Sequence, residues 1–130
     1  MNLDKLFFVI RGIPGSGKST LGSSIAYKCW EADKYFDFFH GGEFVPHEIG
    51  RAHEWCKERV REDMEAGIAR LAVANTFTRK WEMEPYLEMA EEMGYTCIVL
   101  VVENHHGNKS VHNIPQEIID KMVNRFEVYL

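Results

Sequence analysis

The chain carries near its start a complete G-x-x-x-x-G-K-[ST] pattern, a type of sequence that binds phosphate. In such a loop, backbone N–H groups surround the phosphates, the lysine contacts the β- and γ-phosphates, and the hydroxyl binds Mg²⁺. Glycines let the main chain wrap closely around an anion. We therefore expect a nucleoside triphosphate site, with Lys18 on the phosphates and Ser19 on the metal. Its residues are Gly12, Ile13, Pro14, Gly15, Ser16, Gly17, Lys18, Ser19 and Thr20.

Such a loop needs a strand that leads into it and a helix that leaves it, so that the first helical amides point at the anion. The apolar run 6–10 predicts a buried parallel strand over about 5–11. Residues 18–30 contain no proline and predict the helix. This order favours a phosphate site over the alternative of a chance glycine-rich turn.

Further along the chain, apolar runs alternate with segments of helical pattern. They predict a loop over 37–46, helices over about 46–66, 78–93 and 115–126, and buried strands over 71–74 and 95–102. Strands that alternate with helices predict a single α/β domain over residues 1–130, with a short central parallel sheet flanked by helices. Ligands bind beyond the carboxyl ends of such strands, so the places for chemistry are the turns at 12–19, 32–36, 75–78 and 103–112.

Composition narrows the classes of function. The 130 residues are 45% hydrophobic and 27% charged, with a net charge of −5. No apolar stretch reaches the roughly twenty residues that cross a bilayer, and the cysteines show neither a disulfide nor a zinc spacing. We expect a cytoplasmic protein with no membrane partner. The acidic balance argues against a large nucleic-acid footprint but allows a small basic site for one strand end or a single nucleotide.

Phosphoryl transfer also needs a group that positions the attacking hydroxyl. Asp33 follows the expected second strand and would face the phosphate loop across the cleft, where a carboxylate can accept the hydroxyl proton. Alternatively, Asp33 caps a helix that begins at Lys34, since aspartate is a good N-cap. The spacing of the residues leaves both interpretations open.

Four segments spread along the chain match one protein family in order. They are Arg11-Gly-Ile-Pro-Gly-Ser-Gly-Lys-Ser-Thr20, Ala32-Asp-Lys-Tyr-Phe36, Ala52-His-Glu-Trp-Cys56, and Asn75-Thr-Phe-Thr78 with Trp81-Glu-Met83 and Pro85-Tyr86; a weaker fifth is Val111-His-Asn-Ile-Pro115. With them the chain resembles the kinase domain of the phage 5′-polynucleotide kinase and its relatives, including the ATPase-like domain of the Nedd4-binding proteins. The resemblance implies a three-layer, kinase-like P-loop NTPase fold.

The resemblance also implies roles for individual residues. Asp33 matches the family's catalytic carboxylate, the general base on a 5′-hydroxyl. Lys109 lies where family members commonly place a lid arginine that contacts the transferring phosphate; lysine keeps the charge but loses the planar fork. Asn75 and Thr76 match the short polar turn near the phosphate loop and the substrate hydroxyl.

The chain departs from the family at three places. Many relatives have an acidic residue that helps to hold the metal's waters where this chain has Ala74, so Mg²⁺ would rest on Ser19 and the nucleotide. Phe36 stands where the phage enzyme has an arginine that grips nucleic acid. The lid region 103–114 is short, and a short lid shields the transfer less well from water.

Other side chains have two interpretations each. His53 either packs within its helix or lines the substrate cleft, and Phe36 either packs onto the core or stacks on a base. Arg79 lies at a helix start, where a cation is disfavoured unless it has an anionic partner, and is a candidate contact for substrate phosphate or adenine. The lid histidines indicate a polar segment rather than a metal cluster; they are His105, His106 and His112.

Together these features predict an ATP- and Mg²⁺-dependent kinase that moves the γ-phosphate of ATP to the 5′-hydroxyl of a nucleic-acid end or a nucleotide. One alternative is a kinase for a small hydroxyl compound such as a nucleoside or metabolite, which the acidic charge and Phe36 favour. Another is a nucleotide-binding interaction module with little catalysis, which Ala74 and the short lid favour. The sequence indicates no oligomeric state.

Overall fold

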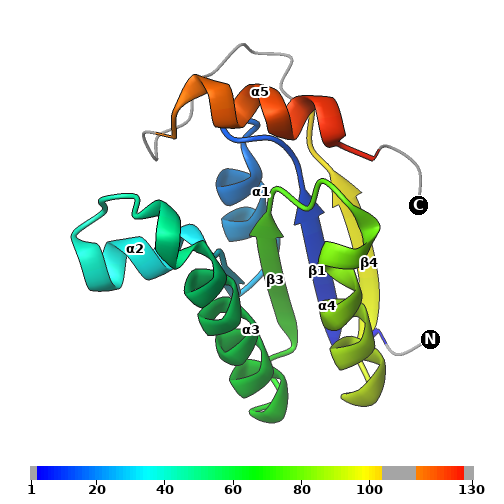
Figure 1. Ribbon diagram of the computed structural model, residues 1–130. Coiled ribbons are helices and arrows are strands. Elements are labelled where there is room, and N and C mark those ends of the chain that lie inside the picture. Colours follow the sequence, from blue (N-terminus) through cyan, green and yellow to red (C-terminus); the bar gives the residue numbers. More distant parts are fainter. Residues whose placement is uncertain (1–2, 104–113, 128–130) are drawn as a thin grey trace.

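In the computed structural model, which describes residues 3–103 and 114–127, four strands form one parallel sheet. The strand order is β2-β3-β1-β4, and each neighbouring pair is parallel (Figure 1). This arrangement confirms the predicted α/β fold with a central parallel sheet. The elements are β1 (Leu6–Arg11), α1 (Lys18–Ile25), β2 (Lys28–Trp30), α2 (Asp33–His40), η1 (Pro46–Glu48), α3 (Ile49–Glu65), β3 (Arg70–Asn75), α4 (Lys80–Glu92), β4 (Thr96–Val101) and α5 (Gln116–Arg125).

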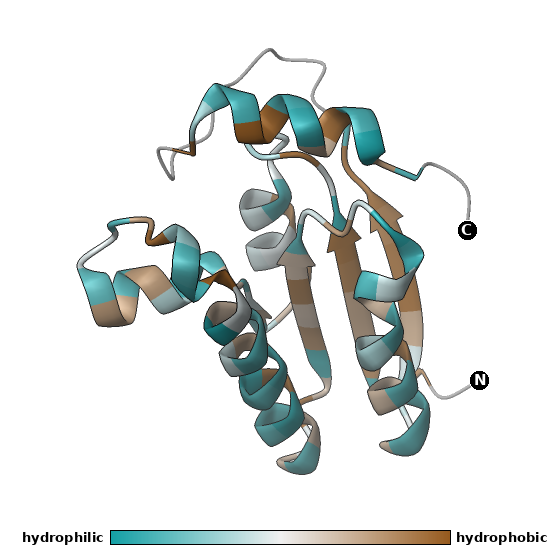
Figure 2. Ribbon diagram, viewed as in Figure 1, coloured by the Kyte–Doolittle hydropathy of each residue, from teal (hydrophilic) through white to brown (hydrophobic). Residues whose placement is uncertain are grey.

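Helices cover both faces of the sheet. α1 packs on one face, α3 and α4 pack on the other, and α5 lies across the carboxyl ends of the strands (Figure 1). Alternate residues of each strand therefore belong to different cores. Phe7 and Val9 pack with α3 and α4, whereas Phe8 and Ile10 pack with α1. Figure 2 shows the result, because the strands are apolar along their length and the outer helices are largely hydrophilic.

The helix expected over 18–30 is wrong beyond Ile25. The backbone becomes extended at Ala26, and residues 28–30 form β2, which pairs with β3. Three residues show no periodicity that separates a strand from a helical continuation. The pairing with β3, a tertiary contact, therefore decides the conformation of this segment.

A buried carboxylate on α3 fastens the short outer strand. Trp30 Nε1 donates to Asp63 Oδ2 at 2.6 Å, and Lys28 Nζ donates to Asp63 Oδ1 at 3.4 Å. These contacts tie β2 to α3. They fix the point at which the chain leaves β2 and enters the region beyond the carboxyl ends of the strands.

The loop expected over 37–46 is wrong up to His40, because α2 continues to that residue. Its aromatic residues are only moderate helix formers. Tertiary contacts stabilise the helix instead: Phe36 is buried in the core, and the hydroxyl of Tyr35 donates to Glu48 Oε1 at 2.6 Å.

The other predicted elements are confirmed. The strands expected over 71–74 and 95–102 are β3 and β4, and the three later helices are α3 (preceded by the short η1), α4 and α5. Within residues 3–103 and 114–127, no helix has the length and apolar character needed to cross a bilayer.

Candidate active site

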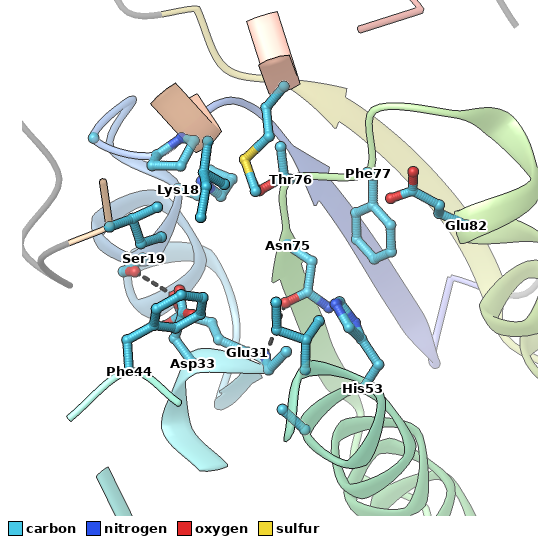
Figure 3. A pocket seen from close by; sticks show the side chains of 18 of the residues that line it. Lys18, Ser19, Glu31, Asp33, Phe44, His53, Asn75, Thr76, Phe77 and Glu82 are labelled. Carbon is cyan, nitrogen blue, oxygen red and sulfur yellow. Dashed lines mark hydrogen bonds between the residues drawn. The ribbon is translucent and has the colours of Figure 1, made fainter. Parts of the chain in front are cut away.

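The carboxyl ends of the strands border a cavity of about 700 Å³. Its walls come from the phosphate loop, the segment after β2, the turn after β3, and parts of α2, α3 and α5 (Figure 3). Lys18, Ser19, Asp33, Asn75 and Thr76, which are far apart in the sequence, all line it. The cavity therefore lies where an open parallel sheet usually binds its ligand.

The phosphate loop connects β1 to α1 and turns at two glycines. Gly15 has a φ of 85°, and Gly17, the N-cap of α1, has a φ of 98°, values that favour glycine. The first turn of α1 leaves N–H groups without acceptors inside the helix, and this end of the helix borders the cavity. These amides fit a bound phosphate chain. The cavity is lined by Pro14, Gly15, Gly17, Lys18, Ser19 and Thr20, whereas Gly12, Ile13 and Ser16 are not on its wall.

Lys18 lies between the loop and two carboxylates. Its Nζ donates to the carbonyl oxygen of Ile13 at 3.1 Å. Burial lowers the pKa of Lys18, whereas the charges of Asp33 and Glu31 raise it. The lysine is thus held in the cavity by a neutral carbonyl contact, which phosphate oxygens can replace.

Close packing at the base of the loop leads to a prediction. A Cβ on Gly12 would lie 2.5 Å from the carbonyl oxygen of Val102 and 2.6 Å from Ser16 Oγ, whereas a Cβ on Gly50 of α3 would meet no atom of the described residues within 4 Å. We expect Gly12→Ala to weaken ATP binding and to lower the free energy of unfolding by about 1–3 kcal/mol through overpacking. Gly50→Ala, the matched control, should raise it by about 0.4–1 kcal/mol. Calorimetry and chemical denaturation measure both effects; equal stability of the two variants would contradict this argument.

Asp33 occupies the first position of α2 and lines the cavity. The N-cap of α2 is Ala32, and no side-chain hydrogen bond caps the helix, so the interpretation of Asp33 as the cap is wrong. The backbone beside Asp33 is held from β3, because Ala32 N donates to Asn75 Oδ1 at 2.8 Å. Asp33 and Lys18 therefore share one cavity.

The turn after β3 has a strained backbone that a buried arginine supports. Phe77 has a φ of 47°, which is uncommon for a residue other than glycine. Arg11 Nε and Nη2 donate to the carbonyl oxygen of Phe77 at 3.1 Å and 2.8 Å. Asn75, at the start of this turn, accepts from Ala32 and donates to Cys56 Sγ at 3.8 Å. The side chain of Asn75 is thus engaged by the protein itself and anchors the segment after β2.

The cavity wall formed near Asp33 is apolar and negatively charged. Phe36 and Phe44 form its apolar part; away from Asp33, beside Phe77, Glu82 adds a further carboxylate to the cavity (Figure 3). His53 also lines the cavity; it is accessible, yet desolvation by the surrounding protein lowers its pKa, and the charges of Glu82 and Asp33 raise it less. The lowered pKa favours the neutral form of His53.

α5 contributes side chains that sequence reasoning did not single out. Lys121 and Arg125 line the cavity one helical turn apart, with Met122 between them. The Met122 sulfur lies 3.9 Å from the hydroxyl oxygen of Thr76. The signal in the sequence was a pair of cations at i and i+4 on an amphipathic helix after Pro115. These residues bring positive charge to the cavity from the last helix.

Glu31 also lines the cavity, and sequence reasoning gave it no role. Ser19 Oγ donates to Glu31 Oε1 at 2.6 Å (Figure 3). The available signal was an acidic residue directly after a strand, at the edge where ligands bind. Among residues 3–103 and 114–127 no group of three or more His, Cys, Asp and Glu side chains is suited to a metal ion. A metal bound at Ser19 would therefore need oxygens from a nucleotide as well.

Some of the predicted residues do not reach the cavity. Arg79 Nη1 lies 3.2 Å from Glu127 Oε1, and Arg79 is not part of the cavity wall. The anionic partner of this arginine is therefore a carboxylate of the protein. Lys109 and the three lid histidines lie outside the described residues.

Comparisons with known proteins agree with this geometry. The model of an AAA domain family, AAA_33, matches residues 7–128. NEDD4-binding protein 2 of Homo sapiens is 25% identical over 134 residues, a match that covers 94% of this chain and 8% of that protein. The chain thus spans less than a tenth of the length of this relative.

Solved structures share the fold. The TM-score is 0.62 to a chain in the structure of the Pnkp1/Rnl/Hen1 complex, at 15% identity, with coverage of 100% of this chain and 42% of that one. It is 0.55 to a chain in the crystal structure of AvrRxo1-ORF1:-ORF2 with ATP, at 17% identity, with coverage of 77% and 37%. At these identities the similarity shows a shared fold and nothing finer.

Proposed function

Because this chain belongs to the AAA_33 family of AAA domains, we propose that it is a phosphotransferase that moves the γ-phosphate of ATP to a hydroxyl. The observation that carries the proposal is that Lys18, Ser19 and Asp33 line one cavity. A cation for the phosphates, a hydroxyl for the metal and a carboxylate for the acceptor proton are the groups that phosphoryl transfer requires from a protein.

Each residue has a distinct proposed role. The loop amides and Lys18 hold the phosphates, and Ser19 would hold Mg²⁺, which neutralises phosphate charge when bound. Asp33 takes the proton of the acceptor hydroxyl while the oxygen of that hydroxyl bonds to the γ-phosphorus. The bond from the γ-phosphorus to the bridging oxygen breaks, and ADP leaves. Lys121 and Arg125 add positive charge at the cavity. Lys109 is proposed to cover the transferring group.

We propose the 5′-hydroxyl of a nucleic-acid end or a nucleotide as the acceptor. The support is the resemblance to the phage 5′-polynucleotide kinase, since the matching segment 32–36 contains the proposed base. His53 and Thr76 line the same cavity and would contact this acceptor, with Phe36 against its base. Asn75 would act indirectly, by holding the segment that carries Asp33.

A second acceptor class, an uncharged hydroxyl compound such as a nucleoside, is favoured by the charge of the wall. Within the described residues, the part of the wall formed by α2, α3 and the segment between them contributes Asp33 but no lysine or arginine. Glu82 adds further negative charge. A phosphate on the acceptor would be repelled by these carboxylates.

Competition between acceptors tests the proposal. With radiolabelled ATP, we expect label on a 5′-hydroxyl oligonucleotide or a nucleoside 3′-monophosphate, and none when the 5′ oxygen already carries phosphate. Preference for the free nucleoside over its 3′-monophosphate would favour the second acceptor class. ATP binding without transfer to any acceptor would contradict the kinase proposal and favour a nucleotide-binding module.

A further inference from the structure

Glu31 is a buried carboxylate that forms no salt bridge with another described residue. It is 7% exposed, and no lysine, arginine or histidine nitrogen of the described residues lies within 4.0 Å of its oxygens. Its side chain accepts the hydrogen bond from Ser19 and lines the cavity. Lys18 acts on Glu31 electrostatically but forms no salt bridge with it, so the cost of burying the carboxylate is only partly offset. Glu31 therefore has the surroundings of a group that meets its cation when a ligand binds.

The hydrogen bond between Ser19 and Glu31 leaves the serine oxygen able to bind a metal. A hydroxyl has one proton and two lone pairs, whereas an ionised carboxylate only accepts. The Ser19 proton is therefore directed at Glu31 across the 2.6 Å bond. The lone pairs point elsewhere, which is the orientation that a metal ligand needs.

The segment that carries Glu31 is held in place on both sides. The amide of Ala32 donates to Asn75 Oδ1 at 2.8 Å, and the amide of Lys34 donates to the carbonyl oxygen of Glu31 at 3.1 Å. The carboxylate therefore sits at a fixed strand end and not on a free loop. A group that positions a metal needs such a rigid support.

The neighbouring strand offers no carboxylate to Ser19. Residue 74, next to the end of β3, is Ala74, which is buried with Phe8 and Ile10 in the core under α1. A charge at that position would enter an apolar cluster. Of the two strand ends, β2 is thus the one that supplies a carboxylate.

We propose that Glu31 completes the magnesium site of this protein, holding Ser19 and the metal's waters from the end of β2 in place of a residue at the end of β3. Mg²⁺ in phosphoryl-transfer sites is bound through one or two carboxylates, waters and substrate phosphates, and this donor set fits it. The inference rests on the proposed use of ATP. It gives the two carboxylates of residues 31–33 different roles: Glu31 holds the metal, and Asp33 takes the proton of the acceptor hydroxyl.

ATP affinities measured by calorimetry, in excess Mg²⁺ and in a chelator, give the metal-dependent gain without any activity. We expect Glu31→Gln to bind ATP in chelator as tightly as the unmodified chain does. The increase in ATP affinity on adding Mg²⁺ should be about 10–100-fold smaller in this variant, the usual effect of removing such a partner. Glu31→Asp keeps the charge and should keep more of the gain. If Glu31 only shaped the loop, the order would reverse, because the amide oxygen of glutamine still reaches Ser19 and the shorter aspartate does not.

Glu48→Gln is the matched control. Glu48 is also buried and accepts a 2.6 Å hydrogen bond from a hydroxyl, that of Tyr35, but it does not line the cavity. This variant should leave both affinities unchanged. The inference would be overturned if Mg²⁺ raised the ATP affinity of Glu31→Gln as much as that of the unmodified chain, or if the variant lost the same factor of ATP affinity in both buffers. If the increase in ATP affinity with Mg²⁺ depends on Glu31 but no acceptor is phosphorylated, the kinase proposal fails and the metal site stands. If the unmodified chain does not bind ATP, both proposals fail.

Discussion

Asp33→Asn is expected to slow phosphoryl transfer about 10²–10⁴-fold, the usual contribution of a positioned general base, while ATP affinity changes little. The amide keeps the shape of the side chain at the start of α2 but cannot take the hydroxyl proton. It also removes one of the two charges that raise the pKa of Lys18, so this pKa should fall further below its usual value. Single-turnover transfer and calorimetry with ATP measure the two effects separately.

Asp37→Asn provides the control for this variant. Asp37 lies one turn further along α2, is exposed, and does not line the cavity. Removing the charge of Asp37 should leave the rate of phosphoryl transfer unchanged. If Asp33→Asn transferred phosphate at the rate of the unmodified chain, Asp33 would not be the general base. If the variant lost ATP binding, the role of Asp33 would be in nucleotide binding instead.

Arg11→Met is expected to lower the free energy of unfolding by roughly 2–4 kcal/mol. Arg11 is fully buried, and its two hydrogen bonds to the carbonyl oxygen of Phe77, at 3.1 Å and 2.8 Å, are charge-assisted bonds worth about 1.5–3 kcal/mol each. Its guanidinium also lies 4.3 Å from the ring centroid of Phe126, a contact worth about 0.5–2 kcal/mol. One nitrogen, Nη1, has no hydrogen-bond partner among the described residues, which reduces the total. Chemical denaturation measures the loss.

The comparison variant is Arg59→Met on α3. Arg59 also lies over an aromatic ring, 5.9 Å from the centroid of Trp55, and bonds Glu62 at 2.7 Å, but this pair is on the surface. Its removal should cost less than about 1 kcal/mol. Equal losses in the two arginine variants would show that the buried contact to Phe77 does not stabilise the strained turn.

Long apolar runs were sufficient to locate most of the sheet. Residues 6–10 and 71–74 are buried on both faces, so their sequence has the continuous apolar character of central parallel strands. A strand before Asp33 was expected but its bounds were not, because a three-residue edge strand has neither length nor periodicity, and its pairing with β3 joins segments about forty residues apart. The sequence prediction ended α2 too early for a similar reason. The burial of Phe36 and the hydrogen bond from Tyr35 to Glu48, which stabilise this helix, are tertiary contacts.

The sequence by itself determined the phosphate loop, because all of its parts are neighbours in the chain: the glycines, Lys18, Ser19 and the strand and helix on either side. It also singled out Asp33 as the candidate base, with the help of the family pattern. Only the tertiary structure decided what surrounds these residues. The bond from Ser19 to Glu31, the anchor from Asn75 to Ala32 and the cations of α5 join segments 12 to about 100 residues apart. Local patterns carry no information about such contacts, because packing of the helices on the sheet brings these side chains together.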